Sequence, residues 1–391
     1  MRTASVRPVS RVADRGVTLV EALVALAVLA LVLASFLVAF TRFQKAARVQ
    51  ADVASATEDL RHIAAAALRV VRMAGCGGLP IATPASEGAV RPVAVDIVDN
   101  HSSTDGLVSS LSGEPWRFSC NRAPVSGSDV LRLRGVTRGP VFDVGPAQAA
   151  TTGQVSIPEE SPWTGQPQRL EYPRSTDGRP FLLTMRAPLE IGGGAFGRRH
   201  YSQYRIVTVT GDAELVNGDG GRALHLSYDA SGFSFLNPFG ATDVDAQQVV
   251  GCGFVNDEAL FIAANNFGEP SLYRVRVTRS GGRFVAEEMV PNVCDLQVAF
   301  GCDIDGNGEV RHDEWFLSGD RPGAPTEEEL VSLMQLRLSL VMRSQSRDLG
   351  WRDGLEALEN SSGLEAGARQ FRYRSTTMRV NLRSHPGASR W

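Results

Sequence analysis

Twelve residues in the C-terminal third of the chain have the spacing of oxygen ligands around a hard cation. Asp303, Asp305 and Asn307 take positions one, three and five of this stretch, and glycine takes position six. The carbonyl of Glu309 stands at position seven and the carboxylate of Glu314 at position twelve. Calcium prefers six to eight oxygen ligands, and this spacing wraps them around one centre. The pattern therefore predicts a calcium site.

The same stretch also has a simpler interpretation. Asp305-Gly306 and Asn307-Gly308 are favoured turn pairs, so a tight hairpin turn without a cation would need the same residues. Position nine is Arg311, where a water-bridging oxygen is usual. Strand-like residues precede the loop, so it would connect strands rather than two helices. The sequence leaves both interpretations open.

Another carboxylate, Glu21, stands at the front of residues 22–40, an apolar run without charge, proline or glycine. As a helix, residues 17–40 would be roughly 36 Å long, enough to cross a hydrocarbon core of ~30 Å. An acid inside a membrane helix is costly and usually functional. A partner ammonium would offset the cost of removing the charge from water. We therefore expect a membrane span whose acid serves assembly rather than catalysis.

Two plainer interpretations fit the N-terminus less well. A secretory signal peptide has an apolar core of ~7–15 residues before a cleavage site of small residues. This run is longer and leads into Thr41-Arg42-Phe43. A simple membrane anchor would give no role to Gly16 or Glu21.

The stretch Gly16-Val17-Thr18-Leu19-Val20-Glu21 resembles the type IV prepilin signature. The resemblance implies that a dedicated peptidase cuts after Gly16 on the cytoplasmic side, which makes Val17 the first mature residue. It also implies that Glu21, then the fifth residue, pairs with the N-terminal ammonium of a neighbouring subunit. Val17 departs from the usual phenylalanine or methionine at that position.

Further segments along the chain resemble, in the same order, the PilW family of type IV pilus assembly proteins. These segments are residues 73–76, 127–131, 300–308, 340–344 and 373–383. The family consists of large minor pilins related to the J-type minor pseudopilins of type II secretion. The resemblance implies a single-pass protein of the inner membrane, with a periplasmic C-terminal domain that reaches the pilus tip. Its implied partners are other minor pilins, the major pilin, prepilin peptidase and, as a further candidate, a tip adhesin.

The rest of the chain predicts an α+β fold of the pilin type, in which a long N-terminal helix packs on an antiparallel β-rich domain. Residues 17–74 lack glycine and proline, and apolar residues recur at steps of three and four from Val49 to Ala74. Glycines at 75, 77 and 78 and Pro80 predict the end of this helix. The expected regions are a leader at 1–16, a transmembrane half-helix at 17–40, an amphipathic periplasmic half at 41–75, and a β-rich domain at 76–391 with a loop-rich insertion at about 135–200.

Alternating apolar residues predict eight strands, a hairpin turn and a short helix in the β-rich domain. The strands are expected at 128–134, 204–210, 223–228, 259–263, 272–277, 294–300, 336–342 and 371–382, the turn at 217–220, and a capping box at 326–329.

Composition excludes several other functions. A net charge of −3 and a pI near 6.1 argue against nucleic-acid binding. The histidines lack metal-ligand spacing, and no nucleophile elbow or cysteine–histidine signature is present, so we expect no enzyme. The glycine-rich stretch 192–197 lacks a strand–helix context and predicts a loop. The arginines of residues 1–16, which precede the apolar run, favour a cytoplasmic location of the N-terminus.

Five cysteines follow the apolar run, and a periplasmic domain would permit disulfides. Cys76–Cys120 and Cys252–Cys294 are the expected pairs, whereas a strand of roughly 26 Å would keep Cys294 from Cys302.

The leading hypothesis is a minor pilin that helps to prime pilus assembly. The alternatives are a minor pseudopilin of type II secretion and, from another class, a membrane-anchored calcium-dependent adhesin.

Overall fold

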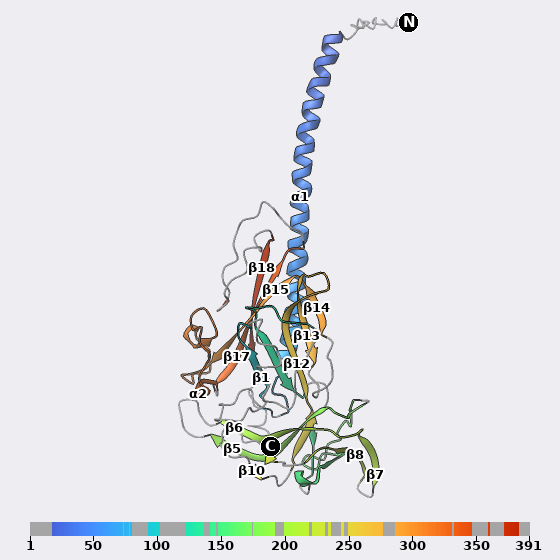
Figure 1. Cartoon of the computed structure of the whole chain (residues 1–391), viewed down its shortest axis with the longest axis vertical. Coiled ribbons are helices and arrows are strands. Elements are labelled where there is room, and N and C mark those ends of the chain that lie inside the picture. Colours follow the sequence, from blue (N-terminus) through green and yellow to red (C-terminus); the bar gives the residue numbers. More distant parts are fainter. Residues whose placement is uncertain are drawn as a thin grey trace, which may run out of the picture. The chain divides into compact units, whose positions relative to one another are not determined.

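The computed structural model shows one long N-terminal helix followed by antiparallel β-sheets (Figure 1). The chain divides into two compact units, Met1–Ser55 and Ala56–Trp391. The structure describes residues 18–72, 74–77, 79, 93–101, 122–136, 141–145, 148–173, 175–191, 199–218, 221–230, 234–235, 244–245, 249–276, 286–330, 332–345, 359 and 371–382. The leader, Gly16, Val17, Cys120 and the glycine-rich stretch lie outside these residues.

The N-terminal helix α1 runs unbroken over 54 residues, Leu19–Arg72, as its lack of glycine and proline predicts. Its first part is long and apolar enough to cross a membrane by length and composition, and none of that stretch is buried. Exposed leucine, valine and phenylalanine side chains cover it. This exposure is what a lipid-facing or subunit-facing helix requires.

The C-terminal part of α1 supplies one side of the core of the second unit. Its buried residues are Ala56, Leu60, Ile63, Ala67 and Val71. The predicted apolar seam is therefore correct from Ala56 onward, except that Val71 is more deeply buried than its neighbour Val70.

Two glycines end helix α1 at the position where the sequence predicts the end of the helix. Gly75 and Gly77 have positive φ values of 79° and 94°, which residues with a Cβ rarely adopt. The nitrogen of Gly75 donates to the carbonyl of Arg134 at 3.0 Å, and the nitrogen of Val136 donates to the carbonyl of Cys76 at 2.8 Å. These bonds fix the end of the helix to the following sheet.

The main core lies between α1 and two antiparallel sheets. The first has the order β1 (Val95–Val98), β2 (Val130–Gly135), β12 (Asn256–Ala264), β13 (Pro270–Arg276) and β14 (Glu287–Pro291). The second has the order β16 (Trp315–Phe316), β15 (Val293–Cys302), β17 (Leu333–Arg343) and β18 (Tyr373–Asn381). Leucines from β12, β15 and β17 meet in this core. The helix α2 (Glu327–Leu330) begins with the expected capping box, in which Thr326 and Glu329 exchange bonds of 2.8 and 3.3 Å.

A second apolar core contains the two strands predicted at 204–210 and 223–228 together with strands that the sequence did not predict. One sheet has the order β3 (Phe142–Asp143), β11 (Gly251–Phe254), β5 (Pro180–Ile191) and β6 (Arg199–Thr208). The other has the order β4 (Gln154–Pro158), β8 (Gly221–Ser227) and β7 (Glu214–Gly218), and the short strands β9 (Ser234–Phe235) and β10 (Val244–Asp245) pair with each other.

Within the range 135–200, where a loop-rich insertion was expected, the structure contains three strands that the sequence did not predict, β3, β4 and β5. Two of these strands have only two and five residues, too short for a clear period. β5 carries Phe181, Leu182 and Leu183 in succession, all fully buried, so no polar residue alternates with them.

A buried ion cluster joins two strands of the first sheet. Arg132 Nη2 and Arg134 Nε lie 2.6 and 3.1 Å from Asp257 Oδ2. Burial opposes the charge of Asp257, but the two guanidinium groups outweigh it and hold the pKa of that carboxyl below its ordinary value. The cluster fixes β2 against β12.

The expected Cys252–Cys294 disulfide is wrong, because both thiols are free. Cys252 lies in the second core, whereas Cys294 lies on β15 beside the first. Cys294 and Cys302 stand near opposite ends of β15 and do not pair, as predicted. Burial raises the pKa of both thiols to about 12, which keeps them protonated and unreactive.

Candidate functional site

A capping box holds the carboxylate of Glu21 at the first turn of α1. The backbone nitrogen of Thr18 donates to Glu21 Oε2 at 2.9 Å, and the hydroxyl of Thr18 donates to the same oxygen at 3.0 Å. In return, the nitrogen of Glu21 donates to Thr18 Oγ1 at 3.3 Å. Thr18 is thus the N-cap and Glu21 the third helical residue, an arrangement that satisfies otherwise unpaired backbone donors.

The capping box fixes the position of the Glu21 carboxylate through hydrogen bonds within the chain itself. Both bonds from Thr18 end on Oε2, and Oε1 takes part in neither of them. The side chain is exposed on an exposed apolar helix. A carboxylate in such a place can accept a charge-assisted hydrogen bond from an ammonium group of another chain.

The predicted cation loop connects β15 to β16. β15 ends at Cys302 and β16 begins at Trp315, and these strands pair through Phe300↔Phe316 and Gly301↔Trp315. The connection is a twelve-residue loop between strands, as the residues before it predict, and the tight two-residue turn does not form. A short 3-10 helix, His312–Glu314, closes the loop.

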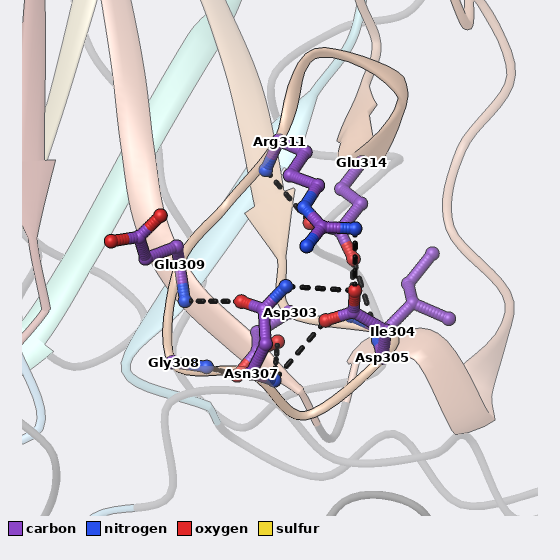
Figure 2. A network of polar contacts seen from close by, with 8 residues as sticks. All are labelled: Asp303, Ile304, Asp305, Asn307, Gly308, Glu309, Arg311 and Glu314. Carbon is purple, nitrogen blue, oxygen red and sulfur yellow. Dashed lines mark hydrogen bonds and ion pairs between the residues drawn. The ribbon is translucent and has the colours of Figure 1, made fainter.

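Backbone nitrogens organise the first half of this loop around side-chain oxygens (Figure 2). The nitrogen of Asn307 donates to Asp303 Oδ1 at 3.0 Å and to Asp305 Oδ1 at 3.1 Å. The nitrogen of Gly308 donates to Asp303 Oδ2 at 3.0 Å, and that of Glu309 to Asn307 Oδ1 at 2.7 Å. Gly308, at position six, has a φ of 88°, a left-handed conformation that glycine adopts without steric cost.

Glu314 connects the end of the loop to its beginning. Its Oε1 accepts from the nitrogens of Ile304 and Asp305 at 2.9 and 3.4 Å, and its Oε2 accepts from the nitrogen of Arg311 at 2.7 Å. Asp303 and Glu314 are each 5% exposed. The loop therefore keeps two carboxylates close together with little access to water.

The geometry brings together most of the predicted ligand set. Carboxylate oxygens of Asp303, Asp305 and Glu314 all lie within 4.8 Å of one another. Asn307 contacts this group, since its Nδ2 donates to Asp305 Oδ2 at 2.7 Å. The carboxylate of Glu309 points away from the group in Figure 2, so only its backbone carbonyl is a candidate ligand. Three carboxylates and an amide are a donor set that suits a hard divalent cation.

A cation of the chain itself also contacts this group. Arg311 Nη1 lies 3.0 Å from Asp305 Oδ2, in an ion pair whose side chains are 64% and 42% exposed. Exposed ion pairs contribute little free energy, so a divalent cation could displace the guanidinium. Arg311, at position nine of the loop, would thus compete with a cation for Asp305.

Comparisons with known proteins find matches at both ends of the chain. Residues 259–384 match the family model described as Type IV Pilus-assembly protein W (PilW), and residues 11–37 match the prokaryotic N-terminal methylation motif. Together the two matches support a type IV pilus-related pilin, consistent with the PilW family. No curated protein and no solved structure matches it.

The two matches contain both parts of the candidate site. The methylation motif includes Gly16 and Glu21, and the PilW region extends from β12 through β18 and includes the loop 303–314. The second core, built mostly from residues 142–254, lies outside both matches. The apolar helix and the prepilin motif indicate a membrane-anchored, single-pass protein, and the PilW family is a structural component of the pilus.

Sequence reasoning missed the role of Thr18, although a signal was present. Thr18-Leu19-Val20-Glu21 is a capping box of the Ser/Thr-x-x-Glu type just before an apolar run. The same pattern was recognised at 326–329.

Proposed function

We propose that this PilW-type pilin is a minor pilin that helps to prime type IV pilus assembly within an initiation or tip complex. Prepilin peptidase would cut it after Gly16, leaving Val17 as the first residue. Its partners would be other minor pilins and the major pilin. The N-terminus would be cytoplasmic and the β-rich domain periplasmic.

The observation that carries the proposal is the capped carboxylate of Glu21 on an exposed apolar helix. Moving such a helix from lipid into a bundle of helices removes the carboxylate from any remaining water. The charge then needs a partner, because an unpaired buried carboxylate is strongly unfavourable. The N-terminal ammonium of a neighbouring mature subunit has the required charge and lies at a similar depth in the membrane.

The test is the replacement Glu21→Ala in a strain whose pili depend on this protein. We expect Glu21→Ala to be made and inserted normally but to restore few or no pili. The matched control is Glu58→Ala, which removes an exposed glutamate of the same helix that lies 4.0 Å from His62. Normal piliation with Glu21→Ala would refute the proposal.

A minor pseudopilin of type II secretion would use the same helix and the same acid. Secretion assays separate the two functions. A null strain that loses pili but secretes normally supports the pilin, and the opposite result supports the pseudopilin.

We also propose that the loop 303–314 binds calcium through Asp303, Asp305, Asn307, Glu314 and the carbonyl of Glu309. The cluster of three carboxylate oxygens favours this proposal. Bound calcium would add charge neutralisation to a loop already shaped by backbone bonds. It would stabilise the β15–β16 connection by an amount that grows with the logarithm of the ratio of calcium concentration to the dissociation constant.

Isothermal titration of the full chain in detergent tests calcium binding. We expect one calcium per chain, with weak affinity of ~10⁻⁴–10⁻³ M as in other extracellular sites of this type. Asp305→Asn should weaken binding without unfolding the loop, because this residue is half-exposed. Absence of binding at millimolar calcium would contradict the proposal.

A further inference from the structure

The strand β7 lies at the outer edge of the sheet β4–β8–β7, beside β8 (Figure 1). Among the described residues, no strand pairs with its other side. Leu215 and Val216 of β7 are 38% and 37% exposed. An open strand edge is a template for pairing with another chain.

The register shows which main-chain groups face outward. β7 and β8 pair through Gly218↔Gly221, Val216↔Ala223 and Glu214↔His225. Gly218 and Gly221 flank a two-residue connection, so they form a hydrogen-bonded pair, and every second residue of β7 does the same. The N–H and C=O groups of Leu215 and Asn217 therefore point away from β8.

This edge lacks the features that usually block pairing. The edge strand β14 carries Glu287, Glu288 and Pro291, and its register with β13 is irregular. β18 carries two exposed arginines. By contrast, β7 has a regular register, no proline and a single charge, Glu214 at its first residue.

The loop before β7 holds the strand in place. Thr176 is fully buried, and its hydroxyl donates to the carbonyl of Gly211 at 3.1 Å and accepts from the nitrogen of Ala213 at 2.7 Å. Asp212 Oδ1 accepts from the nitrogen of Thr176 at 3.0 Å. The edge is thus ordered before binding, which lowers the entropic cost of pairing.

We propose that the open edge of β7 pairs antiparallel with β7 of a second copy of this chain. The edge is self-complementary when Val216 faces Val216 of the other copy. Leu215 then faces Asn217, so the outward residues of each strand form two hydrogen-bonded pairs. The two valines form the central, non-hydrogen-bonded pair, whose Cα atoms approach to ~4.5 Å.

The charges of β7 agree with this register. Glu214 faces Gly218 of the other copy, and the two Glu214 carboxylates stand four residues apart along the strands, or roughly 13 Å. That distance exceeds a Debye length of ~8 Å in physiological salt, so their repulsion is screened. The joined sheets would have the order β4–β8–β7–β7–β8–β4.

The contact is small. One pair of five-residue strands buries far less than the ~1,200 Å² of a stable interface in solution. Confinement of both copies to one membrane raises their effective concentration and makes such a contact effective.

Cysteine cross-linking of the full chain in membrane vesicles tests this proposal. Val216→Cys would place two thiols in the central pair, within the ~4.4–6.8 Å Cα separation that a disulfide accepts. We expect a homodimer on mild oxidation, formed about tenfold faster than in the wild type, which sets the background from native cysteines. The matched control is Asn217→Cys, whose two copies would be about 8 Å apart and should stay at background.

A second variant tests the hydrogen bonds of the edge. Asn217→Pro removes an outward N–H without touching a bond to β8, so in the Val216→Cys background it should abolish the homodimer. Equal cross-linking of Val216→Cys and Asn217→Cys would overturn the proposal. The proposal would also be overturned if the Val216→Cys chain formed a disulfide with a different protein and no homodimer. In that case the edge of β7 would pair with a strand of that other protein. Glu21→Ala should leave the cross-link intact, which separates this contact from pilus assembly.

Discussion

Thr18 donates two hydrogen bonds to one oxygen of Glu21, at 2.9 and 3.0 Å. The acid at the front of the membrane helix is therefore already hydrogen-bonded within its own subunit. In the proposed assembly, a neighbour's ammonium would therefore join a carboxylate whose position is already set. Thr18 would be a positioning residue for that encounter.

Replacement of Thr18 by valine tests this role. Thr18→Val keeps the branched shape and removes the hydroxyl, and loss of an N-cap hydroxyl typically costs ~1 kcal/mol of helix stability. We expect normal insertion but several-fold fewer pili, counted by electron microscopy. Thr41→Val is the control, because that hydroxyl only bonds the carbonyl of Val38 within the helix. Equal pilus counts for both variants would show that the cap is dispensable.

Removal of Asp257 should destabilise the second unit strongly. Asp257→Ala leaves two buried guanidinium groups without their carboxylate, which typically costs ~3–5 kcal/mol. Urea denaturation measures the loss. Glu171→Ala is the control, because its pair with Arg169 is exposed and separated by 3.8 Å, so no measurable change is expected. A similar small effect for Asp257→Ala would contradict the account of this cluster.

The same cluster predicts a dependence on acid. The folded-state pKa of Asp257 lies below its unfolded value, so its contribution is present above the unfolded value and is lost as pH falls through the folded one. The free energy of unfolding of the wild type should therefore fall more steeply than that of Asp257→Ala in strongly acidic solution.

Asp129 should produce the opposite dependence near neutral pH. Burial raises the pKa of Asp129 to about 7, and the nearby charges of Asp99 and Asp295 add to this rise. Hydrogen bonds from the nitrogens of Asn100 and Val298, at 2.8 and 2.7 Å, lower the pKa but do not cancel the rise. A raised pKa means that this contribution is present below the unfolded value of 3.8 and is lost as pH rises through about 7. Asp129→Asn should flatten the curve of unfolding free energy between the unfolded pKa of 3.8 and the folded pKa of about 7. An unchanged slope would show that Asp129 does not titrate there.

Arg311 should weaken cation binding by the loop. Arg311→Ser removes the guanidinium 3.0 Å from Asp305 and supplies an oxygen at position nine. We expect calcium affinity to rise by roughly tenfold, or ~1.4 kcal/mol, in the titration described above. Arg321→Ser is the control, because Arg321 lies 3.2 Å from Glu329 rather than in the cluster. Weaker binding by Arg311→Ser would contradict the competition.

Particular residues show how far the sequence could predict this structure. Helix α1 was predictable because no glycine or proline interrupts it and because Gly75 and Gly77 end it. The loop 303–314 was predictable because its candidate ligands are close in sequence. The ion pair of Arg132 with Asp257 was not, because the fold joins residues 125 positions apart in the chain. In the second core, β6 and β8 were predictable from alternation, whereas β3, β4 and β5 were missed because they are short or uniformly apolar, and neither pattern has a period.

The identity of the first residue of the mature protein tests the central claim most directly. The chain is expressed in full with a prepilin peptidase, recovered from membranes and analysed by N-terminal sequencing and mass spectrometry. The account predicts a chain that begins at Val17, after loss of residues 1–16. A chain that still begins at Met1, under conditions in which a known prepilin is cut, would contradict it.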